Sequence, residues 1–273
     1  MEDSNLKDKQ YNTADKYNAR ILIHARYGTN KTPWPIWLFS QYHFGDHARI
    51  IDFGCGNGLL WKVNSFRINA NWQIELTDFS QGMIDAARSY IGASPANINY
   101  QVVDLSQFPA GNRKYSNIVA NHMLYHIEDR EKAIRTISSI LEPGGEFYAS
   151  TVGLSNMQEM KNLVREYTGN DNYALALGNI TDRFSLENGA DQMRTVFDDV
   201  EIIEYPDALE ITDANDLVNY VLSCNDLVPG IQVLPEDQRE AFTRFVDDRI
   251  TRDGKIHITK SSGTFIARKN NPQ

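Results

Sequence analysis

The sequence has few of the features that mark secreted, membrane or metal-binding proteins. Cysteine occurs only at Cys55 and Cys224, which provide neither a disulfide framework nor the paired C-x-x-C spacing of a structural zinc site. No apolar run is long enough to span a bilayer, and residues 1–10 are polar and charged rather than signal-like. We therefore expect a cytoplasmic protein without membrane insertion.

An excess of positive charge is missing as well. The 27 Lys and Arg residues are outnumbered by 36 Asp and Glu residues, which gives a formal net charge of -9. Proteins that bind nucleic acids neutralise phosphates with basic surfaces. The charge balance therefore predicts that neither DNA nor RNA is a partner.

A glycine-rich stretch stands out among the features that are present. From Arg49 to Trp61 it reads Arg-Ile-Ile-Asp-Phe-Gly-Cys-Gly-Asn-Gly-Leu-Leu-Trp. Its β-branched start is typical of a buried strand, and the glycines remove every second side chain where the backbone must bend. We predict a strand, a turn and a helix start. At the carboxyl end of a parallel strand, the free amides of such a turn face the crevice in which open α/β sheets bind ligands.

From residue 50 to about residue 150, apolar strands alternate with amphipathic helices, which favours βαβ units and a parallel sheet. Further strands are expected at 73–77, 98–103, 116–120 and 145–151, and helices at 82–90 and 130–141. Later in the chain we expect helices at 155–167, 185–195, 213–224 and 236–253, a turn-rich segment at 169–178, and a strand at 200–204. A terminal hairpin would pair residues 255–260 with 263–268 across Ser261 and Ser262.

The segment before the first strand combines a helical pattern with aromatic residues. One helix face would carry Tyr11, Ala14, Tyr17, Ile21 and His24, with a stop at Gly28. A second helix would open at Pro35. Two interpretations of Trp34, Trp37 and Phe39 stay open, since they either close over a ligand or cover a hydrophobic sheet edge. Tyr27, Trp34 and Trp37 are also candidates to cover a cation, with core packing as the alternative for Trp37.

The glycine spacing argues against a dinucleotide cofactor. The dinucleotide fingerprint would place glycine or alanine where Leu59 stands. The next strand ends in Asp78, whose carboxylate can accept hydrogen bonds from both hydroxyls of a ribose. Asp104 follows the third strand, and Asn121 with His122 follows the fourth. Four successive strand ends would therefore line one crevice.

Together, four motifs resemble those of the class I S-adenosylmethionine-dependent methyltransferases. They are Asp52-Phe-Gly-Cys-Gly-Asn-Gly58, Asp78-Phe-Ser-Gln-Gly-Met83, Val103-Asp104-Leu105 and Asn121-His-Met-Leu-Tyr-His126. The likeness covers roughly residues 50–151 and is closest to small-molecule enzymes of the ubiquinone/menaquinone-methyltransferase type. It implies S-adenosylmethionine as cofactor, a small-molecule substrate and an α/β fold. That fold is a Rossmann-like, seven-stranded, mostly parallel sheet with helices on both faces, a terminal antiparallel hairpin and helical cap insertions.

The resemblance also implies a role for each strand end. Gly54, Cys55 and Gly56 match the turn that folds around the amino-acid part of the cofactor, with Asp52 orienting the loop. Asn121 matches the position whose backbone faces the methionine ammonium group.

The ribose and the adenine would be held at the next two strand ends. The matching residues are Asp78 for the ribose, Phe79 and Met83 for the apolar walls of the adenine slot, and Asp104 with the Leu105 amide for the adenine amine. Two alternatives stay open. Asp104 can start a turn with Ser106, and Met83 can fill a gap in the core.

Methyl transfer is an in-line displacement that depends on positioning and requires no covalent intermediate. An acceptor hydroxyl or amine still has to lose a proton, and His122, Tyr125 and His126 follow the fourth strand. We place His126 first as a candidate base; the alternative is that it bonds a loop carbonyl. The spacing of the two histidines also suits metal ligands, but no third ligand is evident, so we predict no metal.

These elements divide the chain into four parts. They are a helical lid at 1–45, a cofactor-binding core at 46–151, a cap insertion at 152–197, and the rest of the sheet with a helical insertion at 198–273. The leading hypothesis is a methyltransferase that acts on a small molecule. A non-catalytic S-adenosylmethionine-binding or regulatory protein is the second hypothesis. A nicotinamide-dependent oxidoreductase, disfavoured by Leu59 and Asp104, is the third.

Overall fold

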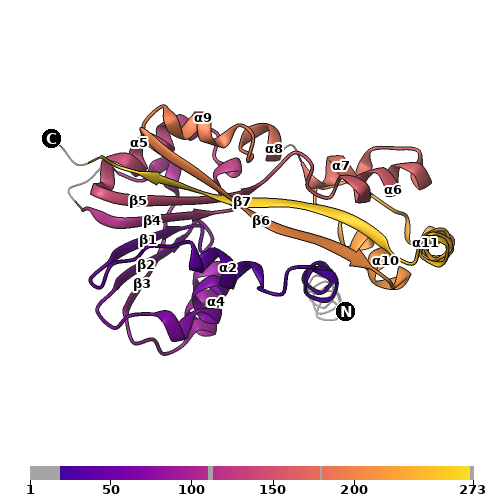
Figure 1. Cartoon of the computed structure of the whole chain (residues 1–273), viewed down its shortest axis with the longest axis horizontal. Helices are drawn as coiled ribbons and strands as arrows, with labels where there is room; N and C mark the ends of the chain where they lie inside the picture. Colours follow the sequence, from indigo (N-terminus) through magenta and orange to yellow (C-terminus); the bar gives the residue numbers. More distant parts are fainter. Residues whose placement is uncertain (1–18, 110–112, 179, 271–273) are drawn as a thin grey trace, which may run out of the picture. The chain divides into compact units, whose positions relative to one another are not determined.

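The computed structural model describes residues 19–109, 113–178 and 180–270 (Figure 1). The chain divides into two compact units. The first comprises Met1–Lys31, Ser155–Asn179 and Pro206–Ser261, and the second comprises Thr32–Leu154, Ile180–Tyr205 and Ser262–Gln273. Three residues of the predicted N-terminal helix face, Tyr11, Ala14 and Tyr17, lie outside the described residues.

Seven strands form one sheet in the order β3-β2-β1-β4-β5-β7-β6 (Figure 1). They are β1 (Arg49–Phe53), β2 (Gln73–Asp78), β3 (Asn97–Val102), β4 (Tyr115–Asn121), β5 (Leu141–Val152), β6 (Asp199–Ile211) and β7 (Ile256–Arg268). Neighbouring strands from β3 to β5 are parallel, and β7 is antiparallel to β5. The predicted fold class is confirmed.

Helices cover both faces of this sheet, and alternate residues of each strand serve the two faces. Ile50 packs with α2 (Trp34–Ser40), α3 (Leu59–Val63) and α4 (Gln81–Ile91), as part of one hydrophobic cluster. Ile51 belongs to a second cluster with α5 (Arg130–Ile140) and α9 (Gly189–Arg194). Because the adjacent residues Ile50 and Ile51 are both buried, the sequence of β1 is a continuous apolar run rather than an alternation of apolar and polar residues.

Side-chain caps set the start of the helices that follow the strands. The Ser80 side chain accepts a hydrogen bond from the Met83 amide at the start of α4, and Asp129 accepts one from the Lys132 amide at the start of α5. Such caps satisfy amides that have no partner inside the helix. In α2, Pro35 occupies the first turn, as predicted.

The first unit is largely helical. Its helices are residues 19–27, α6 (Gln158–Thr168), α7 (Asn172–Leu177), α10 (Ala214–Ser223) and α11 (Arg239–Asp253). The first of them buries Ile23 and Tyr27 and exposes Ile21, and it ends before Gly28, where a stop was predicted. The turn-rich prediction for 169–178 is wrong at α7, because Tyr173 and Ala176, three residues apart, are buried on one face there.

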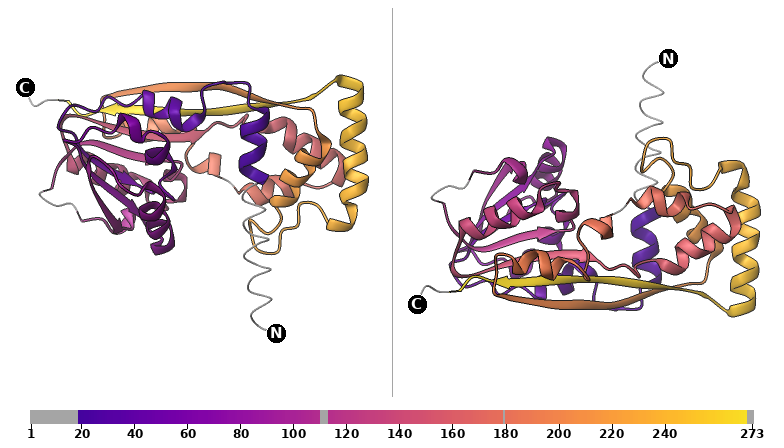
Figure 2. Two further views of the ribbon diagram at one scale, coloured as in Figure 1. Left: turned by 90° about the horizontal axis from the view of Figure 1, so that it is seen from below. Right: turned by 90° about the horizontal axis from the view of Figure 1, so that it is seen from above.

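The last strand corrects the predicted hairpin. β7 continues through Ser261 and Ser262 without a turn, and Ser262 pairs with Val152 of β5. A two-residue hairpin turn favours Asn-Gly or similar pairs with positive φ, which Ser-Ser does not supply. The strand beside β7 is β6, and Figure 2 shows the two lying side by side. β6 is also longer than predicted.

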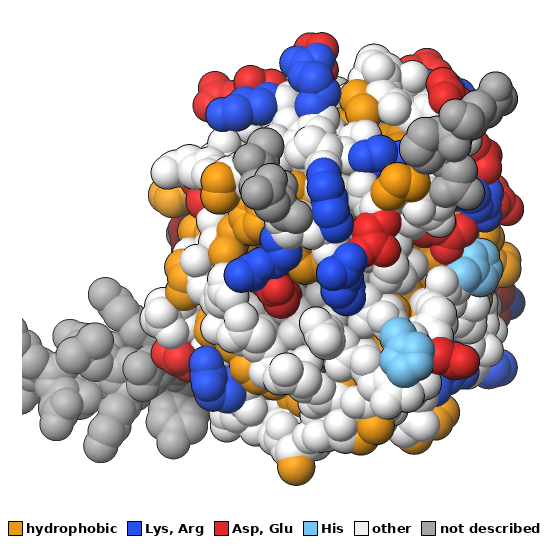
Figure 3. Space-filling model, turned by 90° about the vertical axis from the view of Figure 1, so that its left-hand side faces the viewer, with side chains coloured by type: hydrophobic (Ala, Val, Ile, Leu, Met, Phe, Trp, Pro, Cys, Tyr) orange, Lys and Arg blue, Asp and Glu red, His pale blue; other side chains and the backbone are white. Residues whose placement is uncertain are grey.

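Charges of both signs are interspersed on the face toward which the C-terminal end of β7 points (Figure 3). At the amino-terminal ends of β1 and β2, Arg49 pairs with Glu142, and Arg113 pairs with Glu75 at 3.0 Å. Basic side chains there are thus matched by acids. None of the described helices is long and apolar enough to cross a membrane.

Candidate functional site

The glycine turn after β1 is tied to β2 by its own amides. The amides of Gly54 and Cys55 both donate to the Thr77 carbonyl, at 2.8 and 2.9 Å, and the Gly56 amide donates to Asp78 Oδ2 at 3.1 Å. The expectation that these amides are free for a ligand is therefore wrong. The neighbouring strand uses them, and this fixes the path of the turn.

What the turn offers instead is space. A Cβ on Gly56 would meet no atom within 4 Å, whereas one on Gly54 would lie 3.0 Å from Met123 Cβ. Both glycines have positive φ, which other residues rarely adopt. Gly56 is thus the position of this pair at which a ligand can approach the main chain.

Asp78, at the end of β2, is held between two amides. Its Oδ2 accepts from Gly56 and its Oδ1 accepts from the Ser80 amide at 3.0 Å. Each carboxylate oxygen has a second acceptor position, so the group can still receive two hydroxyl donors. This capacity fits the ribose role that the motif predicts.

Exposed apolar side chains lie beside Asp78. Phe79 is 80% exposed and Met83 is 46% exposed, so the core-filling alternative for Met83 is wrong. Val102 pairs in register with Asp78, points to the same face of the sheet and is 49% exposed. Sequence reasoning missed Val102, because β-branched residues such as Val102 and Val103 at the end of a predicted strand are expected to be buried. Three uncovered apolar groups of this kind fit a planar apolar ligand such as adenine.

Asp104 caps the short 3-10 helix η2 (Leu105–Gln107). Its Oδ1 accepts from the amide and hydroxyl of Ser106, at 2.9 and 2.7 Å, and its Oδ2 accepts from Gln107 at 3.1 Å. These bonds, led by the Ser106 hydroxyl, lower the pKa of Asp104. The turn with Ser106 is therefore present. The Leu105 amide occupies the helix start, where backbone donors lack a partner inside the helix, and a ligand role for this pair stays a prediction.

Asp52 is the buried acid of the site. Asp52 is only 2% exposed, and its Oδ2 accepts a hydrogen bond from Trp61 Nε1 at 2.8 Å. Its Oδ1 has no hydrogen-bond partner within the described part of the chain. An unsatisfied buried acceptor of this kind lowers the stability of the folded state by about 1–3 kcal/mol, so a cationic hydrogen-bond donor would be stabilised at this position. The ammonium group of S-adenosylmethionine fits this requirement.

The pKa of Asp52 is raised to about 7, mainly by burial and to a smaller extent by the nearby charge of Asp78, while the Trp61 hydrogen bond acts in the opposite direction. Burial also raises the pKa of the Cys55 thiol, with Asp52 and Asp78 as further causes. Cys55 is thus a neutral thiol near pH 7 and contributes shape rather than charge to the turn.

Asn121 ends β4 and is fixed by a residue that sequence reasoning missed. Its Nδ2 donates to the hydroxyl of Tyr42 at 2.9 Å. Tyr42 is buried just beyond α2, and burial raises the pKa of its hydroxyl. The only signal in the sequence is the general need of a buried tyrosine hydroxyl for a polar partner. The predicted contact of the Asn121 backbone with the cofactor stays a prediction.

The three candidate catalytic residues have different surroundings. His122 has a positive φ of 49°, and its ring lies 5.4 Å from that of Trp34. Tyr125 and His126, in the 3-10 helix η3 (Leu124–His126), form an edge-to-face pair with centroids 4.6 Å apart. Desolvation, and then the charge of Arg183, lower the pKa of His126, whereas burial raises that of Tyr125 to about 12. At pH 7 His126 is therefore a neutral acceptor and Tyr125 a protonated phenol.

The aromatic residues before β1 take part in packing. Trp34, Trp37 and Tyr205 form mutual ring contacts of 5.0–5.3 Å, and both tryptophans are only partly buried against the cluster around Ile50. Trp34 links this group to His122. Tyr27 lies in the first unit, where it is buried and donates to Asp216 at 2.6 Å. Its hydroxyl is thus already committed within that unit.

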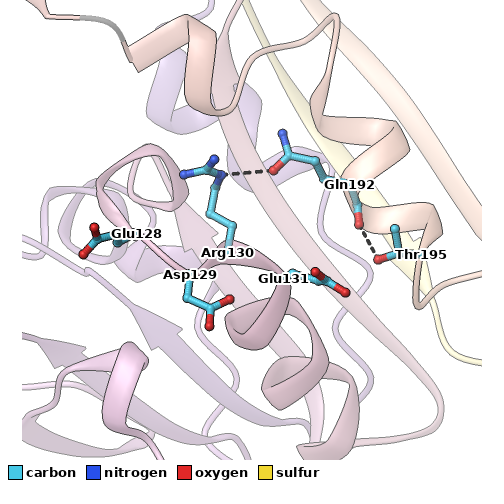
Figure 4. A pocket seen from close by; sticks show the side chains of 6 residues that line it. All are labelled: Glu128, Asp129, Arg130, Glu131, Gln192 and Thr195. Atoms are coloured by element: carbon cyan, nitrogen blue, oxygen red, sulfur yellow. Dashed lines mark hydrogen bonds between the residues drawn. The ribbon is translucent and has the colours of Figure 1, made fainter.

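A separate hollow of about 400 Å³ lies between the start of α5 and the C-terminal end of α9 (Figure 4). Three acidic residues and Arg130 line it, and Arg130 donates to the Gln192 side chain at 3.0 Å. None of the predicted site residues lies in this lining. In the described ranges, no three His, Cys, Asp or Glu side chains are grouped as metal ligands would be.

Comparison with known proteins gives a consistent result. A family model for a methyltransferase domain matches residues 34–193. A ubiquinone biosynthesis O-methyltransferase from Coxiella burnetii (strain Dugway 5J108-111) is 27% identical over 103 residues, which are 38% of this chain and 43% of that protein. The chain thus spans less than half the length of the curated relatives it matches first.

Two solved structures have a similar fold. The YcgJ protein from Bacillus subtilis has a TM-score of 0.55 at 14% identity, covering 86% of this chain and 97% of that one. Phosphoethanolamine N-methyltransferase 2 from Haemonchus contortus, in complex with S-adenosyl-L-methionine, has a TM-score of 0.52 at 15% identity, covering 96% of this chain and 58% of that one. At such low identities the likeness shows the fold alone.

Proposed function

The chain belongs to the class I S-adenosylmethionine-dependent methyltransferases, and from this premise we propose that it methylates a small-molecule acceptor by direct in-line displacement. When bound, S-adenosylmethionine supplies a methyl group activated on a sulfonium. In the transfer the sulfur–methyl bond breaks, a bond from the methyl carbon to the acceptor atom forms, and S-adenosylhomocysteine is released. An acceptor hydroxyl or amine gives up one proton.

The observation that carries this proposal is the arrangement at the ends of β1 and β2. A buried carboxyl with one open oxygen (Asp52), a second carboxyl with spare acceptor positions (Asp78) and uncovered apolar side chains (Phe79, Met83) follow neighbouring parallel strands. These groups match, in order, an ammonium, a ribose and an adenine ring. Gly56 leaves room for the amino-acid part of the cofactor.

We assign the proton transfer to His126. Its lowered pKa makes it a neutral acceptor at pH 7. His122 and Tyr125 have supporting roles in this proposal, because His122 packs against Trp34 and Tyr125 holds a pKa of about 12. Positioning of the acceptor in line with the methyl group supplies much of the acceleration.

The small-molecule acceptor rests on two observations. The charge balance is acidic and the described basic side chains at the amino-terminal ends of β1 and β2 are paired with acids, which disfavours a nucleic acid. The matched relatives include a ubiquinone biosynthesis O-methyltransferase and a malonyl-[acyl-carrier protein] O-methyltransferase. The names of these relatives describe acceptors of different kinds.

The test is incubation of the full chain with S-adenosylmethionine and a panel of phenols, catechols, carboxylic acids and amines. Formation of S-adenosylhomocysteine that depends on one acceptor supports the proposal. Binding of S-adenosylmethionine without transfer to any acceptor supports the non-catalytic alternative. Binding of reduced nicotinamide cofactor, followed by its absorbance, would favour an oxidoreductase.

A further inference from the structure

The hydrogen bond between Trp61 and Asp52 has no part in the roles assigned so far. We propose that Trp61 is a positioning residue that holds the Asp52 carboxyl, directs its open oxygen toward the cofactor ammonium group, and couples cofactor binding to proton release. This inference rests on the proposed cofactor role of Asp52 and extends it to a residue on α3.

The geometry leaves the Trp61 ring no freedom. Trp61 is fully buried in the first turn of α3, with its ring centroid 5.9 Å from that of Phe39 in a perpendicular contact and 6.3 Å from that of Phe44 in a stacked one. An indole nitrogen can only donate a hydrogen bond. Asp52 Oδ2 therefore remains an acceptor in both protonation states. Since the carbonyl oxygen of a protonated carboxyl is a better acceptor than its hydroxyl oxygen, this bond favours placing the proton of Asp52 on Oδ1.

Oδ1 is the oxygen that has no partner in the described part of the chain. When Asp52 is protonated on Oδ1, this oxygen presents a hydrogen-bond donor to the ligand. An ammonium group is also a donor, so the two do not pair. When Asp52 is ionised, Oδ1 is a charged acceptor for it. The fixed bond to Trp61 thus divides the carboxyl into an anchored oxygen and a ligand-facing oxygen.

The groups that face Asp52 favour a cationic ligand. They are Asp78 on β2, Tyr42 beyond α2 and Cys55 in the turn. The charge of Asp78 raises the pKa of Asp52, and after burial the charge of Asp52 raises the pKa of Tyr42 and of Cys55. All three are acids, and the charge of Asp78 disfavours a second negative charge nearby. A bound ammonium group would relieve this repulsion and would stabilise the ionised form of Asp52.

Cofactor affinity should depend on pH through the charge of Asp52. Because burial raises the pKa of Asp52 to about 7, we expect affinity for the cofactor to rise as the pH increases toward and through 7, and binding near neutral pH to release a proton. The Trp61 hydrogen bond favours the ionised carboxylate. Its removal raises the pKa of Asp52 and moves the rise in affinity to higher pH.

The experiment is calorimetric titration of S-adenosylmethionine into the full chain from pH 5.5 to 8.5, in buffers of different ionisation enthalpy so that released protons are counted. Trp61→Phe keeps the buried ring and removes the donor. We expect affinity about 3- to 10-fold weaker at pH 7 and recovery at higher pH, because one hydrogen bond to a charged group is lost. In Asp52→Asn the amine of the cofactor still titrates, but the carboxyl does not. This variant should therefore lose the proton release that Asp52 contributes on binding.

Trp72→Phe is the matched control. Trp72 is buried in the same hydrophobic cluster, and its Nε1 donates to the Gly45 carbonyl at 2.8 Å. Its pH profile should follow the wild-type one. A Trp61→Phe profile parallel to wild type, or a loss that is equal at all pH values, would overturn the inference, as would unchanged proton release in Asp52→Asn. If the wild-type chain fails to bind the cofactor at any pH, the proposed function itself falls.

Discussion

The ends of β1 and β4 make unlike contributions to the same edge of the sheet. At the β1 end, backbone amides and carboxylates are joined by hydrogen bonds within the protein, as in the bond from Gly56 to Asp78. At the β4 end, the backbone amides of His122 and His126 also donate to backbone carbonyls. Their rings pack against aromatic neighbours, and His122 has a strained backbone. The comparison teaches that the side chain of the predicted binding acid Asp78 is held by hydrogen bonds from backbone amides, whereas the ring of the candidate base His126 packs against an aromatic neighbour.

The largest expected effect is on the β1 and β2 side. Asp78→Ala removes the acceptor for two ribose hydroxyls and the anchor of the Gly56 amide. We expect S-adenosylmethionine affinity to fall by about 100-fold or more, because each hydrogen bond to a charged group contributes about 1.5–3 kcal/mol. Calorimetry measures the affinity, and circular dichroism checks the fold. Asp85→Ala, an exposed acid on α4, is the control and should bind normally; equal affinities for the two variants would refute the assignment of Asp78.

On the β4 side, His126→Ala should leave cofactor affinity unchanged and lower kcat by about 100-fold if His126 is the base. The pKa of this histidine lies below its ordinary value near 6.5. The wild-type rate should therefore rise with pH through an inflection below 6.5 and be level at pH 7. Rates of the variant that keep this inflection would exclude His126 as the base.

The two glycines of the turn allow space and conformation to be separated. Gly54→Ala should lower the free energy of unfolding by about 1–2 kcal/mol, since positive φ is costly and Met123 lies in the way. Gly56→Ala should cost less stability and more cofactor affinity, because its Cβ enters open space. Chemical denaturation and calorimetry measure the two quantities. Gly169→Ala, also at positive φ in open space, should lose stability alone.

The smallest effect concerns Arg183. Arg183→Ala removes a charge that lowers the pKa of His126, so the inflection of the rate profile should move to higher pH. The level rate at high pH should stay unchanged. A comparison of rate profiles for the two proteins tests this, and identical inflections would show that Arg183 does not act on the reactive group.

Much of the fold and part of the site could be predicted because local patterns determine them. Apolar runs that end in Asp52 and Asp78 correctly marked parallel strands and their carboxyl ends, and the family, fold class and cofactor inferred from those motifs are confirmed. Phe79 and Met83 are exposed, and their role as walls of an adenine slot stays a prediction.

The remaining features arise from contacts between distant segments. Whether an amide in the turn is free depends on where the Thr77 carbonyl of the next strand lies, and spacing within the turn carries no information about it. Tyr42 meets Asn121 across 79 positions of sequence, and β7 runs straight through Ser261 and Ser262 because β5 pairs with it. Tertiary pairing overrides local preference at these positions.

The hydrogen bond between Trp61 and Asp52 also allows the charge of Asp52 to be followed through the absorption and fluorescence of Trp61. An indole whose N–H group bonds a carboxyl changes its absorption and emission when that carboxyl gains or loses a proton. Trp61 is one of four tryptophans in the chain, and in the structure it is the one whose indole donates to an ionisable side chain with a pKa of about 7. A difference spectrum between wild type and Trp61→Phe would therefore report the charge of a buried acid without any added label.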